Sequence, residues 1–497
     1  MSQVIVIRRS RCFTVALLAL AALAWVRPAH AAALRTSPCA LGQPAVPAVC
    51  GSLTVFENRT TKSGRTIDIH FVVLKAERSS GRAIFWNPGG PGAGATQFAP
   101  LIAGGNFESY LSRLRDRYDI VLVDNRGTGL SHELQCHMFP PSDPAPYYRQ
   151  IWPDAALRSC RSTLAKNADL SAYTTDIAAD DLDDIRAALG YSKIALSGAS
   201  YGTEFFLDYA RRHPSHVESI LLQGVVPPHF LIVPLQDARG AQAAMTSVIA
   251  TCATDADCKT HFPRLREHFQ AVVHRFDEGM LSVRIKNAAT HTLQTVSLSK
   301  EVFADRLRQT LYSNYTAAYA PYILERAYAG DYVPLGMMIE GATQGLGSLV
   351  AQGENLSTTC AEDIPFITEA DVARTSAGTF EGPARLRAQQ HACAIWNVRR
   401  ASSAFQDPVR TNAPVFMISG TDDPTTPPEY ARAALRYFSN GKMLEIANES
   451  HNLDAPCAMK LSEQFIREAS VKHLDTASCA GAYHRPAFAT SMSGFED

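Results

Sequence analysis

The pentapeptide GASYG at residues 198–202 has the pattern GxSxG and lies between a predicted strand and a predicted helix. The strand covers residues 194–196, and the helix begins near Glu204. A turn this tight needs small residues two positions before and after its central serine. It exposes the hydroxyl of Ser200 at the carboxyl edge of a sheet and points the N-terminus of the helix at it. The pattern therefore predicts a nucleophilic serine at position 200.

A base is expected near this serine, because a serine hydroxyl is a weak nucleophile at neutral pH. A strand is predicted at residues 443–446, and the loop after it reads NESH and ends at His451. The carboxyl ends of parallel strands form the edge of an open α/β sheet where ligands collect. Of the 15 histidines, only His451 lies in the loop directly after the last predicted core strand, so we expect it to be the base.

An orienting acid is expected in the loop GTDDPTTP at residues 420–427, which follows a predicted strand at 415–418. In sheets of this type the chain order is serine, acid and then histidine, and this loop lies between the other two members. Asp422 and Asp423 both fit this position. One of them is expected to cap the helix near Pro427 or to face solvent, and the spacing alone leaves the choice open.

The oxyanion of a tetrahedral intermediate needs backbone donors that are already in place. One predicted donor is the N–H of Tyr201, directly after the nucleophile. The other is expected from NPGGPG at residues 87–92, which follows a predicted strand at 83–86, and the candidate is the N–H of Gly90. GPGAGA, which begins at Gly90, nearly spells the dinucleotide-binding pattern GxGxxA. Its proline and the lack of an acidic ribose partner on a following strand favour the oxyanion role.

Runs of β-branched and apolar residues alternate with helical patterns, which is typical of a mostly parallel sheet covered on both faces. The alternation stops between residues 228 and 408, where the pattern is mainly helical, and core-type strands resume at Val415. We therefore expect an inserted helical cap over a discontinuous sheet domain. The expected division is a leader at 1–31, the core at 32–227, the cap at 228–408 and the core again at 409–497. The predicted strands cover residues 66–73, 83–86, 120–123, 194–196, 220–222, 415–418 and 443–446.

The first residues have the three parts of a secretory leader. Three arginines between positions 8 and 11 precede an apolar run at residues 12–26, and the small-x-small triplet AHA follows at 29–31. The apolar run is shorter than the roughly 20 residues that span a bilayer. We therefore expect cleavage near Ala31, no stable membrane insertion, and a periplasmic or extracellular protein.

Cleavage there would remove Cys12 and leave ten of the 11 cysteines. An even number of cysteines in an exported chain is typical of a set of disulfides. The spacing does not fix the connectivity, although pairing neighbours along the chain would close five short loops. We expect Cys39–Cys50 and Cys252–Cys258 first among these pairs.

No cofactor and no metal is expected at the site. The chain has no CxxC pair, and HELQC at residues 132–136 has a cysteine where the zinc motif HExxH needs its second histidine. The formal net charge of -1 gives no reason to expect a nucleic acid or an anionic membrane as partner. The expected partner is a peptide or a small ester that binds as substrate.

Together the motifs resemble those of the secreted tripeptidyl aminopeptidase and proline iminopeptidase group of α/β-hydrolases. NPGGPG is similar to the HGGPG oxyanion loop of that group, and DNRGTGLS at residues 124–131 to its DxRGxGxS motif. GTDDPTTP resembles its acid loop G-x-x-D-x-x-T-P, and NESHNLDAPC at 448–457 resembles its histidine loop. The resemblance implies an α/β-hydrolase fold with Asp423 as the acid. Pro88 replaces the histidine of HGGPG, which favours the tripeptidyl aminopeptidase side of the group.

The resemblance also implies the activity of an exported serine hydrolase that releases residues or short peptides from peptide N-termini through an acyl-enzyme. The alternative is a carboxylic-ester hydrolase that uses the same three residues. An aminopeptidase holds the α-ammonium of its substrate, and a partly buried carboxylate is the natural partner. The candidates in the expected cap are Glu340, Glu354, Glu362 and Asp363. CAEDIP at residues 360–365 resembles a Cys-then-acid segment of related proteins, which indicates the last two. The other interpretation of these two is solvated acids beside a disulfide.

Overall fold

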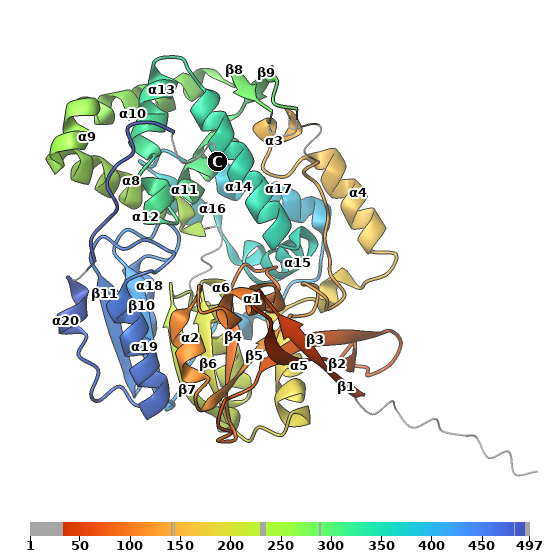
Figure 1. The fold of residues 1–497 in the computed structure, drawn as a ribbon. Coiled ribbons are helices and arrows are strands. Elements are labelled where there is room, and N and C mark those ends of the chain that lie inside the picture. The colour runs from red at the N-terminus through yellow and green to blue at the C-terminus, as the bar shows by residue number, and fades with distance from the viewer. Residues whose placement is uncertain are drawn as a thin grey trace, which may run out of the picture.

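A computed structural model describes residues 33–140, 143, 145–228, 235–287, 290–481 and 483–492. The expected leader and its cleavage site near Ala31 lie outside these residues. The chain forms two layers, a sheet with its covering helices and a largely helical layer that lies over one end of the sheet (Figure 1).

Nine strands form one sheet in the order β1-β2-β3-β5-β4-β6-β7-β10-β11. All neighbours from β5 to β11 pair in parallel, whereas β1, β2 and β3 pair antiparallel at one edge. The expected mostly parallel sheet is confirmed, and two edge strands that were not predicted extend it. The strands are β1 (Leu34–Leu41), β2 (Val46–Phe56), β3 (Thr66–Leu74), β4 (Arg82–Asn87), β5 (Tyr118–Val123), β6 (Ile194–Ala199), β7 (Val217–Gln223), β10 (Val415–Gly420) and β11 (Gly441–Ile446).

Alternate side chains of the central strands enter two separate cores, because successive residues of a strand point to opposite faces. In β4, Ala83 and Phe85 pack into the core under α5, α6 and α18. Ile84 and Trp86 pack into the core under α1, α2 and α19. Burial on both faces explains why these strands are continuous apolar runs. The helices are α1 (Ala99–Ala103), α2 (Ser109–Leu114), α5 (Thr175–Ala188), α6 (Tyr201–Arg212), α18 (Pro428–Leu435) and α19 (Pro456–Glu468).

The second layer, here called the cap, comes mainly from the chain between β7 and β10. The part of it that the structure describes is mainly helical and includes one antiparallel hairpin, β8–β9. Two helices from between β5 and β6, α3 (Ala145–Arg149) and α4 (Asp154–Leu164), also pack against it. Its main elements are α8 (Asp237–Thr254), α9 (Ala256–His261), α10 (Leu265–Arg275), β8 (Leu281–Lys286), β9 (Leu293–Leu298), α11 (Lys300–Thr310), α12 (Asn314–Ala317), α13 (Ala320–Tyr328), α14 (Val333–Leu349), α15 (Gln352–Glu362), α16 (Glu369–Ser376) and α17 (Ala384–Trp396).

The chain after α19 returns from the sheet layer to the cap (Figure 1). The backbone N–H of Ala489 donates to the carbonyl of Ala318 at 3.0 Å, and Phe488 packs against the apolar core of the cap. This segment therefore ties the two layers together at the side opposite β1.

Five disulfides join cysteines that are neighbours along the chain. The expected pairs Cys39–Cys50 and Cys252–Cys258 are confirmed. Cys39–Cys50 closes the β1–β2 hairpin, and Cys360–Cys393 joins α15 to α17 within the cap. The other two pairs are Cys136–Cys160 and Cys457–Cys479.

Protein that lacks the leader is expected to show no reactive thiol when it is denatured without reductant, because all ten cysteines after residue 31 are paired. Replacing both Cys360 and Cys393 by serine is expected to lower the free energy of unfolding by about 2–5 kcal/mol, because the unfolded chain loses a constraint. A thiol assay and denaturant unfolding measure the two effects. Two or more thiols per chain would contradict the pairing.

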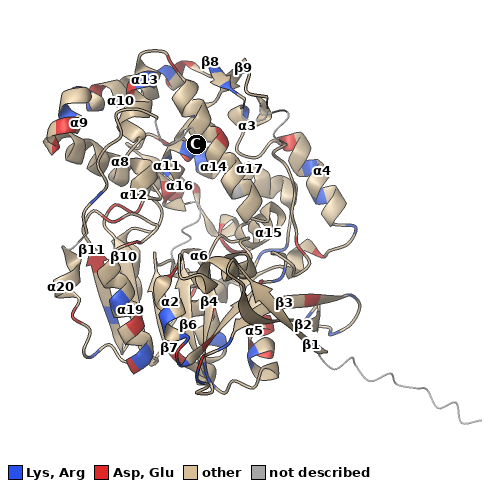
Figure 2. Cartoon of the chain, viewed as in Figure 1, with Lys and Arg blue, Asp and Glu red and all other residues tan. Residues whose placement is uncertain are grey.

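Acidic and basic side chains are interspersed over both layers (Figure 2), in keeping with the formal net charge of -1. Among the residues that the structure describes, no helix combines the length and the apolar character needed to cross a membrane.

Candidate active site

Ser200 lies at the turn between β6 and α6 with φ 54° and ψ -130°, a conformation that side-chain-bearing residues rarely adopt. Its N–H donates to the carbonyl of Gln223 at 2.9 Å, which fixes the turn to the neighbouring strand. A Cβ on Gly202 would lie 2.6 Å from the carbonyl oxygen of Asn87, so the chain comes too close for any other residue. The GxSxG pattern thus reflects close backbone contact around a strained serine.

His451 and Asp423 form a hydrogen-bonded pair, with 2.8 Å between Nδ1 and Oδ2. The other carboxylate oxygen, Oδ1, accepts the N–H groups of Thr425 and Thr426 at 2.9 and 2.7 Å. The Thr426 hydroxyl lies 2.6 Å from Oδ2 and 3.0 Å from His451 Nδ1. Both carboxylate oxygens of Asp423 therefore have hydrogen-bond partners.

Asp423 is 1% exposed. Burial opposes its ionisation, but the neighbouring His451 and the hydrogen bonds from Thr426 hold its pKa below the ordinary value. A lowered pKa keeps the carboxylate ionised through the neutral range, and this ionisation is lost only when the pH falls through that lowered value. Asp422 has another partner, because it forms an ion pair with Arg485 at 3.1 Å.

Ser200 and His451 line one cavity of about 370 Å³ between the sheet and the cap. This volume lies within the range of small-molecule sites. One part of the wall is apolar and the other is charged. The apolar and aromatic lining residues include Phe98, Phe139, Ile151, Trp152 and Val350, and the charged ones are Asp237, Asp305, Arg306, Arg308 and Arg385.

Gly90, one expected oxyanion donor, lines this cavity together with Ser200. The loop that carries Gly90 lies against the turn between β6 and α6. A Cβ on Gly89 would be 2.9 Å from Ser200 Cβ and 3.3 Å from the nitrogen of Tyr201. The N–H of Gly89 is engaged by the Asn87 side chain at 3.0 Å. Tyr201 is the first residue of α6, where backbone N–H groups have no partner within the helix.

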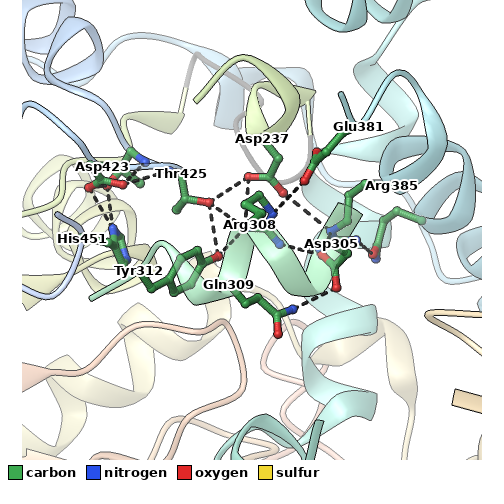
Figure 3. A network of polar contacts seen from close by, with 12 residues as sticks. Asp237, Asp305, Arg308, Gln309, Tyr312, Glu381, Arg385, Asp423, Thr425 and His451 are labelled. Carbon is green, nitrogen blue, oxygen red and sulfur yellow. Dashed lines mark hydrogen bonds and ion pairs between the residues drawn. The ribbon is translucent and has the colours of Figure 1, made fainter. Parts of the chain in front are cut away.

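The charged wall belongs to a largely buried set of six residues in the cap, here called the ion network, and Figure 3 labels all of them except Arg306. Asp305 pairs with Arg308 at 2.7 Å and with Arg385 at 3.0 Å. Burial opposes ionisation of Asp305, but the charges of Arg306 and Arg308 lower its pKa to about 2. The carboxylates on the cavity wall are therefore already neutralised. The members are Asp237, Asp305, Arg306, Arg308, Glu381 and Arg385.

The two acids expected to bind an amine, Glu362 and Asp363, are buried at the end of α15 and are not among the residues that line the 370 Å³ cavity. The Glu362 carboxylate accepts the N–H and the hydroxyl of Thr175 at 2.7 and 2.6 Å. That hydroxyl lies 2.7 Å from the hydroxyl of Tyr201. Two hydrogen bonds thus connect Glu362 to Tyr201, the residue after Ser200.

Glu204, in the first turn of α6, completes a group of three buried carboxyls with Glu362 and Asp363, here called the acid group. Burial and the nearby charge of Asp363 raise the pKa of Glu204 well above its ordinary range, and burial and Glu204 do the same for Glu362. The pKa of Asp363 is raised by burial, by Glu362 and by Asp237. The charge of Asp237, which lines the cavity, thus also acts on Asp363. No ion pair joins these three carboxyls to a cation among the described residues.

Two other places on the described chain lack this pair of side chains. A hollow of about 700 Å³ between residues 57–61, α5, α6 and residues 399–407 contains neither Ser200 nor His451. Asp183, His213 and His216 are close enough to hold a metal ion. One oxygen of Asp183, however, already accepts hydrogen bonds from Arg186, Tyr209 and His216. Neither place combines a nucleophile with a base.

The family follows from a comparison with known proteins. A family model described as the alpha/beta hydrolase fold matches residues 83–453, well over half of the chain. The chain belongs to this α/β-hydrolase family. It is 29% identical to the serine protease Hip1 of Mycobacterium tuberculosis over 241 residues, which is 45% of each chain. It is 30% identical to the tripeptidyl aminopeptidase of Streptomyces lividans over 202 residues, 37% of this chain and 36% of that one.

These matches span less than half the length of the relatives and confirm the resemblance that the motifs indicated. Among solved structures, a thermophilic esterase from Thermogutta terrifontis is similar with a TM-score of 0.37 and 14% identity, over 84% of this chain and 99% of that chain.

Glu204, Thr425 and Thr426 were not predicted as parts of the site. The two threonines had a signal, because an aspartate often accepts the N–H groups two and three residues later in a turn. Glu204 had none, since a glutamate in the first turn of a helix is ordinary and only its burial sets it apart.

Proposed function

We propose that this α/β-hydrolase is an exported serine peptidase with Ser200 as nucleophile. The observation that supports it is the His451–Asp423 pair, 2.8 Å apart, whose histidine shares a closed-in cavity with a strained serine. Ser200 Oγ attacks the scissile carbonyl carbon while His451 takes its proton. Collapse of the tetrahedral intermediate breaks the C–N bond, and His451 delivers the proton to the leaving amine. Water then cleaves the acyl-enzyme by the same steps.

The N–H groups of Tyr201 and Gly90 are the proposed donors to the oxyanion. Both lie beside Ser200, and Tyr201 adds the positive end of the α6 dipole. The cap supports the loop that holds Gly90, because Ala351 N–H donates to the Gly92 carbonyl at 2.9 Å. Donors held in place before the reaction stabilise the developing charge without reorganisation.

We further propose that the substrate enters with its amino terminus toward the acid group, which makes the protein an exopeptidase. Three buried carboxyls that share no cation are costly unless they are protonated or meet a positive ligand. A substrate ammonium would supply that charge. The carboxylates of the ion network are a poorer choice, because arginines already pair with Asp237 and Asp305. The two acids expected from the sequence, Glu362 and Asp363, thus gain Glu204 as a third member.

Acetylating the amino terminus of a peptide substrate is expected to lower kcat/KM about ten- to a hundredfold, the value of a charged hydrogen bond. Glu204→Gln and Asp363→Asn are expected to cause a loss of similar size on free peptides and almost none on acetylated ones, because ammonium and carboxylate are partners. Steady-state kinetics on matched free and acetylated peptide amides measure both losses.

Glu354→Gln is the matched control for these variants. Glu354 lies on α15, is buried, and burial raises its pKa to about 8, but its carboxylate bonds to Thr358 outside the acid group. Glu354→Gln should show the same ratio of kcat/KM between free and acetylated peptides as the wild type. Equal rates on the two substrates in the wild type would refute the exopeptidase proposal, and faster cleavage of short acyl esters would favour the esterase.

Export is proposed on two grounds, the leader-like first residues and the five disulfides, which persist in oxidising compartments. The thiol assay described above also tests this proposal. Protein whose cysteines are reduced when it is taken directly from its natural compartment would contradict it.

A further inference from the structure

The turn that follows α11 of the cap contacts both loops that carry the proposed acid and base. Tyr312 OH lies 3.2 Å from Thr425 Oγ1 in the acid loop, and the Tyr312 ring lies 5.1 Å from that of His451. The Tyr312 carbonyl accepts the N–H of Asn452, next to the base, at 2.8 Å. One cap residue therefore spans the two loops.

The Thr425 hydroxyl makes three polar contacts, and all of them are with the cap (Figure 3). It donates to Asp237 Oδ1 at 2.9 Å and accepts from Arg308 at 2.9 Å and from Tyr312 at 3.2 Å. A hydroxyl has one donor and two acceptor sites, so its capacity is filled. The backbone N–H of the same threonine donates to Asp423 Oδ1 at 2.9 Å. Thr425 thus joins the ion network to the catalytic acid.

The histidine loop is held from the same side. Asn314 Nδ2, in the first turn of α12, donates to the carbonyl of Asn448 at 3.0 Å, and the Ser450 hydroxyl donates to the carbonyl of Leu311. These contacts lie on either side of Tyr312 in the chain. The segment between α11 and α12 is accordingly packed along the whole length of the loop that ends at His451.

We propose that Thr425 and Tyr312 are positioning residues through which the cap holds Asp423 and His451 in line with each other for proton transfer. The acid and base loops come from β10 and β11 of the sheet, but their free ends rest on α8, α11 and the turn after α11. The two loops are also joined directly by the 2.8 Å bond between Asp423 and His451. In addition, the Asp422 N–H donates to the Glu449 carbonyl at 2.9 Å, and the Asn448 N–H donates to the Thr421 hydroxyl at 2.9 Å. The contacts from the cap add to these bonds at Thr425 and at Asn452. This inference rests on the proposed triad and holds for a peptidase or an esterase alike.

Thr425→Val keeps the shape of the side chain and removes the hydroxyl. Its kcat on p-nitrophenyl acetate is expected to fall about ten- to a hundredfold with little change in KM, because small displacements of catalytic groups are costly. Thr425→Ser, which retains the hydroxyl, should recover most of the loss. The acid limb of the profile of kcat/KM against pH should move to lower pH in Thr425→Val, because a misaligned carboxylate stabilises the imidazolium less well.

Thr310→Val is the matched control. Thr310 is a buried threonine of α11 whose hydroxyl donates to the carbonyl of Arg306 at 3.0 Å, and it contacts neither loop. Its variant should lose stability in denaturant unfolding and keep the wild-type kcat and pH profile. If Thr425→Val behaves in this way too, its role is merely structural and the proposal is wrong.

If Thr425→Val does not fold, Tyr312→Phe tests the proposal instead. This substitution removes one hydroxyl and keeps the ring beside His451. Its kcat is expected to fall at least about threefold, and an unchanged kcat would overturn the proposal. In a folded double variant with Thr425→Val, the two losses should not add, because the residues share one contact. Activity that survives Ser200→Ala would instead refute the proposed triad, so the two failures are distinguishable.

Discussion

Ser200→Ala is expected to lower kcat by about 10⁴- to 10⁶-fold on every substrate and to leave the fold unchanged. The hydroxyl is the proposed attacking group, and none of the other hydroxyls described at the cavity lies at a strand-to-helix turn of this kind. Ser200 caps α6 without a side-chain hydrogen bond, so the substitution removes no structural contact. Rates with p-nitrophenyl acetate and a peptide amide, together with labelling by a fluorophosphonate, measure the loss. Residual turnover from the oxyanion donors should remain about 10³- to 10⁴-fold above water.

Ser197→Ala is the matched control for this variant. Ser197 lies three residues earlier, within β6, and its hydroxyl is buried 2.6 Å from that of Tyr110. Loss of this hydroxyl should lower the free energy of unfolding by about 0.5–1.5 kcal/mol, because the buried Tyr110 hydroxyl loses one hydrogen bond and keeps Glu108 and Gln223 as partners. Labelling and kcat should stay near wild type. A Ser200→Ala protein that still turns over substrate at the wild-type rate would refute the serine mechanism.

The central strands could be predicted from sequence because each is buried on both faces and therefore apolar throughout, as β10 is. The edge strand β1 could not, because LRTSPCAL is exposed along most of its length. Pairing with β2 and the disulfide Cys39–Cys50 hold it in place. Both are long-range effects that a local apolar pattern does not report.

The residues of the candidate site divide in the same way, into those that a local pattern indicates and those whose role depends on distant contacts. Ser200 and His451 could be proposed from the sequence because each lies in a short loop after a core strand, and the pattern of that loop indicates its chemistry. Asp423 could be separated from Asp422 only by resemblance, since the difference arises from the turn that directs one carboxylate to His451 and the other to Arg485. The contact between Tyr312 and Thr425 joins residues 113 positions apart, and neither sequence segment indicates it.

The cap therefore contributes more than a cover over the cavity. It supplies the charged wall through the ion network, it supports the Gly90 loop through Ala351, and it holds the acid loop through Thr425. Each of these contacts joins a cap residue to a loop at the carboxyl edge of the sheet. A substitution in the cap can consequently change kcat as well as KM, which a simple lid would not predict.

Asp423→Asn is expected to lower kcat about 10⁴-fold with little change in structure. The N–H groups of Thr425 and Thr426 both donate to Oδ1, so the amide oxygen of an asparagine would keep that place. Its NH₂ group would then replace Oδ2, 2.8 Å from His451 Nδ1. An N–H donor there forces the proton of the neutral imidazole onto Nε2, the atom that must accept the proton of Ser200. In this tautomer His451 cannot accept the proton of Ser200 and cannot act as the base. Kinetics over a range of pH measure this loss.

Asp422→Asn tests the choice between the two neighbours with the same chemical change. Asp422 pairs with Arg485 of the C-terminal segment at 3.1 Å, and loss of its charge leaves a mostly buried guanidinium with a weaker partner. The expected cost is about 1–3 kcal/mol in the free energy of unfolding, with kcat less than about tenfold below wild type. The reverse pattern, a severe kinetic loss in Asp422→Asn and a mild one in Asp423→Asn, would assign the acid to Asp422. It would also remove the basis for Thr425 as a positioning residue, since the backbone of Thr425 donates to Asp423.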